Sequence, residues 1–503
     1  MNPVPSKSES LTVRATWLMF AKAVGFIFSF ALPLLLARRM DPEQYGLYKQ
    51  VFLVVTTAIS VLPLGFGMSA YYFLPRETDM RREVVLNIML VHALIGGLAC
   101  CALFLYPSLL SLIFHGPELA AYSRLIGVTI LLWIIGSFLE MVPVANEEIK
   151  LATAFIVCTQ ASRAVIFLSA ALIFGTVRSL ICAAIVHGSV QAVVLTCYLE
   201  SRFPGFWRRF NWAMLGRQLS YSLPLQSAVL LLTMQTDLHN YFVANRFGPA
   251  LFATYTFGTF QLPLVSLVQE GAHAALFTRV ALLQLHQEHR QIILLTARAA
   301  RKLAAVFFPL YALLIVVGRE FIRFLFTDRY VDAWPLFAAN LTLLPLSIML
   351  LDPIFRSYRS ERFFLLRLRI MLVSALILVM WLWTRQLGLI GVIAVVVSIG
   401  VLERAITIFH FGRLLGVTRK DFYLLKDIGK LALASLVAAL ACAAVRLFIV
   451  SAAPFIVLAV CGTVFAIVYV VAVLGLRVLS REEYQQIREK LANRLPASWL
   501  GAA

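Results

Sequence analysis

The sequence predicts an all-α protein that crosses a membrane about 14 times, and its composition is the first evidence. Of its 503 residues, 61% are hydrophobic and only 14% are charged, with a mean hydropathy of +0.87. A soluble protein averages about 45–50% apolar and about 25% charged residues, so this chain has more apolar surface than soluble domains can bury. The composition excludes a soluble enzyme, a secreted disulfide scaffold and a nucleic-acid-binding protein. Basic cytoplasmic loops explain the net charge of +19 without a nucleic-acid partner.

Runs of apolar residues are the second observation, since a membrane-spanning helix needs about 20 of them. The fourteen expected spans are 17–36, 50–73, 84–106, 125–142, 151–174, 180–199, 223–243, 250–270, 303–318, 334–351, 370–384, 388–409, 431–450 and 454–476. The first run is longer than the core of a signal peptide and ends in Arg38-Arg39, so we expect it to be retained. All seven cysteines lie within apolar runs, at spacings that predict neither a zinc site nor a disulfide framework.

The placement of Lys and Arg is the third observation. With the N-terminus inside, the inner connections hold 30 of the 44 basic residues, the outer connections 11 and the spans three. Cytoplasmic loops carry the excess of basic residues, so we expect both termini in the cytoplasm. The charged and apolar residues of the C-terminal tail alternate at helical spacing, which predicts a short cytoplasmic amphipathic helix.

An internal repeat organises the chain. Residues 37–48 and 244–255 share the pattern Ala-x-Arg-x-x-Pro-x-x-aromatic-x-x-Tyr at an offset of 207 residues. Each copy ends one span, turns at a proline and begins the next, which predicts two six-helix lobes related by an axis along the membrane normal. The expected organisation is an N-terminal lobe (1–200), a cytoplasmic linker (201–222), a C-terminal lobe (223–410), helices 13 and 14 (411–476) and a cytoplasmic tail (477–503). Such lobes enclose a substrate site near the midplane, so the repeat favours a transporter.

Ionisable residues within spans are expensive, and they are therefore candidates for function. Arg163 lies near the middle of the fifth span, with Gln160 on the same helical face. Its guanidinium fork suits phosphate oxygens in an aqueous cavity, although an internal ion pair is the alternative. Lys22 lies in the first span, about a turn from the cytoplasmic end, where it either lines the cavity or extends to the interface.

The seventh span carries a polar stripe. Its members follow helical spacing and are Gln226, Thr233, Asp237 and Asn240, with His239 beside them. We expect Gln226, Thr233 and Asn240 to line the cavity with Gln160, and packing of the stripe on another helix is the alternative. Asp237 and His239 are candidates for coupling to an ion gradient, because a carboxylate in low dielectric can take up a proton or sodium ion and release it. A fixed ion pair of Asp237 with a basic residue such as Arg163 is the alternative.

No catalytic constellation is present in the sequence. It has no Walker-type loop for an ATPase and no carboxylate cluster on a long outer loop. We therefore expect no enzymatic activity and no cofactor, with transport driven by a proton or sodium gradient, by the membrane potential or by the substrate's own gradient.

The first hairpin resembles that of a known family. Residues 34–48, Leu-Leu-Leu-Ala-Arg-Arg-Met-Asp-Pro-Glu-Gln-Tyr-Gly-Leu-Tyr, are similar to the polysaccharide-transport branch of the multidrug/oligosaccharidyl-lipid/polysaccharide (MOP) exporter superfamily, the Wzx-type flippases of O-antigen and exopolysaccharide. Gly248-Pro249 in the second hairpin and Asp237 before it agree with the resemblance, whereas Asp41 stands where many relatives have glycine. Only the hairpins match in detail.

This resemblance implies translocation of an undecaprenyl-diphosphate-linked oligosaccharide from the cytoplasmic to the periplasmic leaflet of the inner membrane, by alternating access. Two lobes would enclose a cationic cavity flanked by helices 13 and 14, with Arg163 and Lys22 on the diphosphate. The bilayer is the expected environment, and a polymerase or glycosyltransferase complex is a further expected partner. Two alternatives stay open: a multidrug or small-cation exporter of the same superfamily, which would need an acidic cavity, and a polysaccharide polymerase or ligase.

Overall fold

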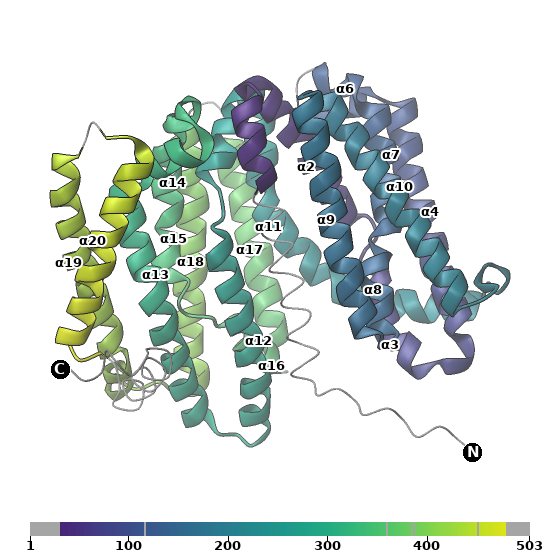
Figure 1. Ribbon diagram of the computed structural model, residues 1–503. Helices are drawn as coiled ribbons and strands as arrows, with labels where there is room; N and C mark the ends of the chain where they lie inside the picture. Colours follow the sequence, from purple (N-terminus) through teal and green to yellow (C-terminus); the bar gives the residue numbers. More distant parts are fainter. Residues whose placement is uncertain are drawn as a thin grey trace, which may run out of the picture. The chain divides into compact units, whose positions relative to one another are not determined.

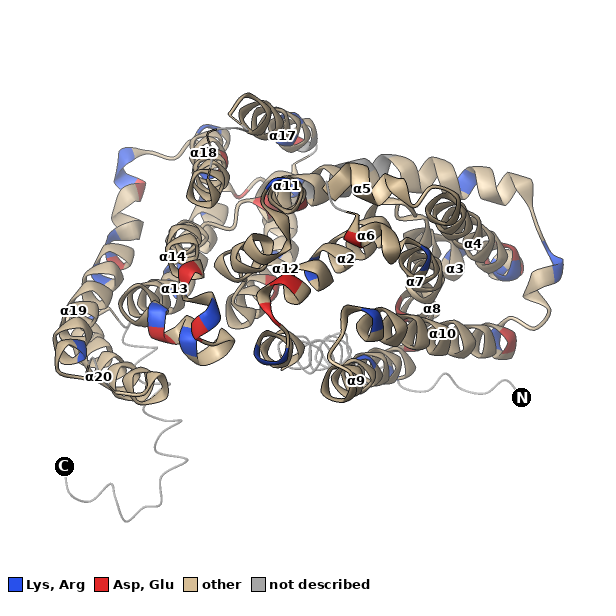
Figure 2. Cartoon of the chain, turned by 90° about the horizontal axis from the view of Figure 1, so that it is seen from above, with Lys and Arg blue, Asp and Glu red and all other residues tan. Residues whose placement is uncertain are grey.

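A computed structural model describes residues 31–114, 117–358, 361–383, 386, 388–449 and 452–478. The secondary structure of these residues is helical, with no β-strand among them, which confirms the all-α prediction (Figure 1). Viewed from above, most of the ribbon carries neither acidic nor basic residues (Figure 2). The N-terminal part of the first expected span, with Lys22, and the expected C-terminal amphipathic helix lie outside the described residues.

The chain divides into two compact units. Unit 1 comprises residues 1–263 and 366–396, and unit 2 comprises residues 264–365 and 397–503. Each unit is described by itself below. The lobe boundaries expected from the sequence remain a prediction.

Residues 31–39 form the first described helix of unit 1. The α-helices that follow are α2 (Pro42–Val61), α3 (Ser69–Arg76), α4 (Arg81–Leu105), α5 (Ser108–Phe114), α6 (Glu118–Ala121), α7 (Ser123–Gly136), α8 (Phe138–Ala145), α9 (Ile149–Ile173), α10 (Val177–Arg202) and α11 (Trp212–Gly258). Short 3-10 helices η1 (Phe66–Met68), η2 (Thr78–Met80) and η3 (Phe206–Arg208) join some of them. Within this unit, α2 packs along α11, and α7 lies between α4 and α10.

Unit 2 begins within α12 (Pro263–Leu285). Its further elements are α13 (His289–Phe326), η4 (Asp328–Ala333), α14 (Trp334–Leu341), α15 (Leu343–Leu346), α16 (Asp352–Ser357), η6 (Arg419–Leu425), α19 (Lys426–Phe448) and α20 (Pro454–Gly475). Two more helices, α17 (Arg362–Leu382) and α18 (Leu389–Leu415), have residues in both units. The two C-terminal helices α19 and α20 pack on each other and on α13, around the buried side chains of Val317, Cys442, Cys461 and Phe465.

Nine of the described helices are long and apolar enough to cross a membrane, and two bent helix pairs bring the number to as many as 11. The pairs are Pro42–Val61 with Phe66–Arg76, bent by 43°, and Thr233–Gly258 with Pro263–Leu285, bent by 55°. The tenth expected span, 334–351, consists of the short helices α14 and α15. The chain is therefore a multi-span membrane protein, and the count of fourteen stays a prediction.

Local sequence explains where the two repeated hairpins turn. Asp41 has extended backbone angles, and its carboxylate accepts a hydrogen bond of 2.8 Å from the backbone N–H of Gln44. Pro42 then occupies the first turn of α2, where a missing N–H costs nothing. In the second copy, Gly248 interrupts α11 at φ 74° and ψ 173°, a conformation that favours glycine, and Pro249 follows. Both turns lie at the proline of the repeat, as the sequence predicts.

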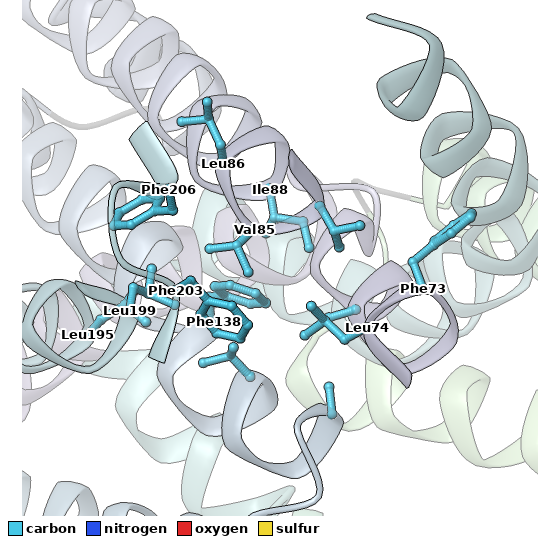
Figure 3. Packing of buried hydrophobic residues seen from close by; sticks show 14 of the residues in the cluster. Phe73, Leu74, Val85, Leu86, Ile88, Phe138, Leu195, Leu199, Phe203 and Phe206 are labelled. Atoms are coloured by element: carbon cyan, nitrogen blue, oxygen red, sulfur yellow. The ribbon is translucent and has the colours of Figure 1, made fainter. Parts of the chain in front are cut away.

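A buried hydrophobic cluster holds one end of unit 1 together (Figure 3). The cluster includes Phe73 and Leu74 of α3, Val85 and Ile88 of α4, and Phe138 of α8, which is fully buried. Residues from α10 and the segment after it complete the cluster, namely Leu195, Leu199, Phe203 and Phe206. Burying such side chains stabilises a fold by about 1.5–3 kcal/mol each where water is the alternative.

Candidate functional site

Unit 1 contains a polar cavity of about 430 Å³. Helices α2, α9 and α11 line it, together with the beginning of the first described helix and the residues that follow α11. Its lining residues are Leu32, Pro33, Tyr48, Lys49, Phe52, Leu53, Thr56, Gln160, Arg163, Ala164, Asn240, Phe252, Thr256, Thr259, Phe260 and Gln261. Two are cations, and none of these lining residues is a carboxylate.

Arg163 lines this cavity, together with Gln160 one turn earlier on α9, and the expected role of Arg163 in binding a phosphate stays a prediction. Its guanidinium carbon lies 5.0 Å from the centroid of the Trp133 ring and 5.8 Å from that of Phe167. Arg163 forms no salt bridge with any described residue. The expected alternative of an internal ion pair is thus absent from the described part of the chain. Cation–π contacts hold the guanidinium and leave its N–H groups available to an anion.

Lys49 is the second cation of the cavity, and sequence reasoning missed it. Hydropathy alone places Lys49 in an outer connection, because the apolar run begins only at residue 50. In the structure α2 begins at Pro42, so Lys49 lies two turns into the helix, with its ammonium 5.7 Å from the centroid of the Tyr45 ring. The Asp-Pro signature of a helix start was the signal that could have found it.

The second copy of the repeat contributes neutral polar groups. Asn240 comes from the part of α11 before the break at Gly248, and Thr256 comes from the part after it. Thr259 and Gln261 lie in the interruption between α11 and Pro263, where α12 begins. Helix interruptions inside a membrane are tolerated where they line a cavity, and this one supplies hydroxyl and amide groups to it.

The offset of 207 residues pairs several lining positions with one another. Residues 33 and 240, 49 and 256, 52 and 259, and 53 and 260 are equivalent in the two copies, and all eight line the cavity. The cavity thus lies between equivalent surfaces of the two hairpins. Its charge does not follow this symmetry, because Lys49 is matched by Thr256 and Arg163 by Ile370. Both cations come from the first half of the chain.

The remaining members of the polar stripe do not line the cavity. Gln226 is buried against η1, where its amide nitrogen lies 2.9 Å from the sulfur of Met68. Thr233 is part-buried, and its carbonyl accepts a hydrogen bond of 3.0 Å from the Thr236 hydroxyl. Asn240 alone of the stripe lies on the cavity. The side chains of a stripe that spans four turns therefore divide between packing and the cavity.

Both candidates for ion coupling lie near the second hairpin. Asp237 is part-buried and forms no salt bridge with a described residue, so its expected alternative partner Arg163 does not pair with it. His239 is buried, with its Nδ1 atom 2.9 Å from the hydroxyl of Tyr255. This contact ties the two legs of α11 together across the break at Gly248.

The two repeated hairpins pack directly on each other. The side-chain amide of Gln50 donates a hydrogen bond of 3.1 Å to the carbonyl oxygen of Ala244, and the hydroxyl of Tyr241 lies 3.4 Å from the carbonyl of Leu53. The rings of Tyr45 and Phe257 stack with centroids 4.8 Å apart. Gln50 is buried, so its hydrogen bond fixes the register of α2 on α11. This interface adjoins the cavity, since Tyr48, Lys49 and Phe52 belong to the same part of α2.

The chemistry of the cavity is that of an anion site. The described residues contain no group of three or more His, Cys, Asp or Glu that could hold a metal ion. The lining combines two cations with amides and hydroxyls. Such a set can bind a phosphate or diphosphate through charge-assisted hydrogen bonds and a neutral polar group beside it.

Comparisons with known proteins agree with this architecture. The family described as "Polysaccharide biosynthesis protein" matches residues 35–335. A relative from Rhizobium meliloti (strain 1021), the succinoglycan biosynthesis transport protein ExoT, is 24% identical over 363 residues, which cover 69% of this chain and 68% of the relative.

Solved structures of similar fold are membrane transporters. The lipid II flippase MurJ, in an inward closed conformation, has a TM-score of 0.70 at 13% identity, covering 93% of this chain and 99% of that one. An inward-facing multidrug resistance transporter of the MATE family, in the MOP superfamily, has a TM-score of 0.61 at 15% identity, covering 82% of this chain and 99% of that one. At these identities the likeness establishes the fold.

Proposed function

The chain belongs to the family described as "Polysaccharide biosynthesis protein", and from this premise we propose that it is a flippase for an undecaprenyl-diphosphate-linked oligosaccharide. It would carry the lipid-linked sugar from the cytoplasmic to the periplasmic leaflet of the inner membrane by alternating access. The names of the relatives support this proposal, since one is a succinoglycan biosynthesis transport protein and another a lipid II flippase.

One observation carries the proposal: Lys49 and Arg163 line a cavity that has no carboxylate among its lining residues. Placing two cations in a low-dielectric interior costs free energy unless an anion or water accompanies them. A diphosphate supplies the missing charge, and the guanidinium fork of Arg163 can bind two of its oxygens at once. The ammonium of Lys49 would act on the same group as a point charge.

The neutral side of the cavity suits the sugar. Four neutral polar residues of the lining come from the second half of the chain, namely Asn240, Thr256, Thr259 and Gln261. Their side chains can both donate and accept hydrogen bonds. Sugar hydroxyls need such partners. We propose that the first half of the chain holds the diphosphate, the second half holds the first sugars, and the prenyl chain stays in lipid.

The two alternatives fit the cavity less well. An exporter of drugs or small cations would need negative charge on its lining, whereas this lining has two positive charges and no carboxylate. A polymerase or ligase would need catalytic carboxylates beside its lipid-linked substrate, and the residues that line this cavity include none. We therefore propose a transporter rather than an enzyme, without a bound cofactor.

Energy for the cycle is proposed to come from a proton or sodium gradient through Asp237. This carboxylate lies on α11, near the residues that contact α2, so a change in its charge would act on the interface between the hairpins. We further propose that both termini are cytoplasmic, as the basic loops predict, and that a polymerase or glycosyltransferase complex is a partner at the membrane.

Substitution of Arg163 tests the proposal. Purified protein in vesicles would be given a diphosphoprenol carrying the oligosaccharide, and appearance of the sugar in the opposite leaflet would be followed with an impermeant sugar-oxidising reagent. We expect Arg163→Gln to weaken substrate binding by about 10-fold to 100-fold, since hydrogen bonds to charged groups contribute about 1.5–3 kcal/mol. Arg163→Lys should restore only part of it, because a point charge lacks the fork.

The matched control is Arg124→Gln, since Arg124 is exposed and does not line the cavity. Translocation by the Arg163→Gln variant at the parental rate, with normal abundance in the vesicles, would overturn the assignment of the cavity.

A further inference from the structure

A second cavity, of about 510 Å³, lies wholly within unit 2. Helix α13, the end of α18 and the 3-10 helix η6 enclose it. Most of its lining residues are apolar, and they include Ile293, Ala297, Met349, Ala405, Ile408, Phe409, Phe411, Val417, Leu424 and Leu425. An apolar cavity of this size has room for part of a hydrocarbon chain.

Basic residues lie at this cavity and next to its lining in the chain, and we call Arg413, Arg419 and Lys420 its basic mouth: the first lines the cavity, and the other two directly precede the lining residue Asp421. Arg413, in the last turn of α18, lines it, and its guanidinium carbon lies 4.6 Å from the centroid of the Phe409 ring. Arg419 and Lys420 follow in η6, and both are exposed. None of these three cations forms a salt bridge with a described residue. They are available to an anionic group.

The carboxylates of the same region are already paired. Asp421 accepts hydrogen bonds from the backbone N–H of Thr418 at 2.8 Å and from its hydroxyl at 2.9 Å, and it also binds Arg290. Asp427 lies 3.6 Å from Arg301 and 3.4 Å from Lys430. The charge left beside the cavity is therefore positive, and these contacts fix η6 as one wall of it.

Exposed aromatic rings place the cavity at a membrane interface. Phe409, Phe422 and Tyr423 are 63%, 64% and 72% exposed. Aromatic residues gather at the level of the headgroups, and basic residues gather on the cytoplasmic side of membrane proteins. The apolar cavity and the basic residues beside it thus match the two parts of an anionic phospholipid, its acyl chain and its phosphate.

We propose that this cavity is a binding site for an anionic phospholipid of the cytoplasmic leaflet. One acyl chain occupies the apolar cavity, and the phosphate and headgroup contact Arg413, Arg419 and Lys420. Basic pockets between helices on the cytoplasmic side are known to hold anionic headgroups, with a juxtamembrane Lys or Arg contributing about 1 kcal/mol each. The site is separate from the residues that line the cavity of unit 1, so it does not depend on the flippase proposal.

The test compares lipids that differ only in headgroup. Purified full-length protein would be titrated with phosphatidylglycerol or with phosphatidylcholine of the same chains, and bound lipid would be counted by native mass spectrometry. We expect phosphatidylglycerol to bind at least tenfold more tightly. Glycerol phosphate, which has the charge but no chain, should not compete.

Two variants separate the parts of the site. The first variant combines Arg413→Gln, Arg419→Gln and Lys420→Gln. It should remove the preference for phosphatidylglycerol, because each lost charge weakens binding of that lipid by about fivefold. Ala297→Trp, which fills the cavity, should weaken both lipids while the basic mouth is intact. The matched control combines Arg82→Gln, Arg208→Gln and Lys302→Gln, since these exposed basic residues also lie in connections expected to be cytoplasmic but do not line the cavity.

Equal binding of the two lipids to the parent protein would overturn the proposal. The proposal would also be overturned if the preference for phosphatidylglycerol fell equally in the mouth variant and in the control. Displacement of phosphatidylglycerol by undecaprenyl phosphate at equal concentration would instead assign the cavity to a prenyl chain.

Discussion

Gly46 of α2 lies directly against Pro249, so closely that a Cβ atom added to Gly46 would lie 1.8 Å from the carbonyl oxygen of Pro249. Real Cβ atoms do not approach a backbone oxygen to this distance. The contact joins the two copies of the repeat, since Gly46 belongs to the first and Pro249 to the second. The two hairpins can therefore meet in this way only while residue 46 has no side chain.

Gly46→Ala is expected to separate the hairpins. Overpacking costs about 1–3 kcal/mol, and more where the neighbour is backbone, so the packed arrangement should lose population. The readout is bismaleimide crosslinking of cysteines placed at Tyr45 and Phe257, whose rings stack in the parent, in a background without native cysteines. We expect a severalfold lower yield in the alanine variant.

Gly97→Ala is the matched control for that change. Gly97 also lies inside a helix of unit 1, but a Cβ there meets nothing within 4 Å. Each substitution replaces a helical glycine by alanine, which gains about 0.8–1.0 kcal/mol of helix propensity. The difference in crosslinking yield between the two variants therefore reports the contact of residue 46 with Pro249. Equal crosslinking in the two variants would contradict the role of Gly46.

Lys49→Gln and Thr256→Val, at equivalent positions of the two repeats, should have different effects. We expect the first to weaken binding of undecaprenyl diphosphate with or without sugar by about tenfold, because it removes a charge from the cavity. The second should weaken only the lipid that carries sugar, because it removes a hydroxyl. Native mass spectrometry with the two lipids measures both effects, and identical profiles would refute the proposed division between the halves.

Asp237→Asn should leave the protein folded and abundant. The side chain has no salt-bridge partner among the described residues, so its neutralisation leaves none of them as an uncompensated buried charge. If Asp237 couples transport to a gradient, the variant should bind substrate normally and lose the response to an imposed proton or sodium gradient in proteoliposomes. Asp79→Asn, at an exposed carboxylate of η2, is the control. An Asp237→Asn variant as responsive as the parent would remove Asp237 from the coupling mechanism.

The expected topology is open to reporter fusions. Fusions after residues 79, 210, 290, 360, 420 and 490 should report the cytoplasm, because the basic connections lie there. Fusions near residues 117, 247 and 326 should report the outer side. Two or more reversals would contradict the fourteen-span topology.

Part of the cavity could be predicted from single residues. Arg163 and Gln160 were found because a charge in the middle of an apolar run has few structural explanations. Lys49 was missed because its neighbours look like a loop by hydropathy, although Asp41-Pro42 marks a helix start. Gln226 and Thr233 were expected on the cavity because they share a helix face with Asn240. The structure places Gln226 against Met68 instead, since successive turns of a long helix meet different neighbours.

The sequence by itself determined the membrane environment, the helical class and the turns at Pro42 and Pro249, because composition and backbone restriction act locally. It also determined that the two hairpins are copies of one pattern. Only the tertiary structure decided that these copies pack on each other, with Gly46 against Pro249 and Gln50 bound to Ala244. Only it decided that Lys49 joins Arg163 on one cavity, since contacts between residues more than 100 positions apart depend on how helices pack, and helical periodicity does not specify which face meets which partner.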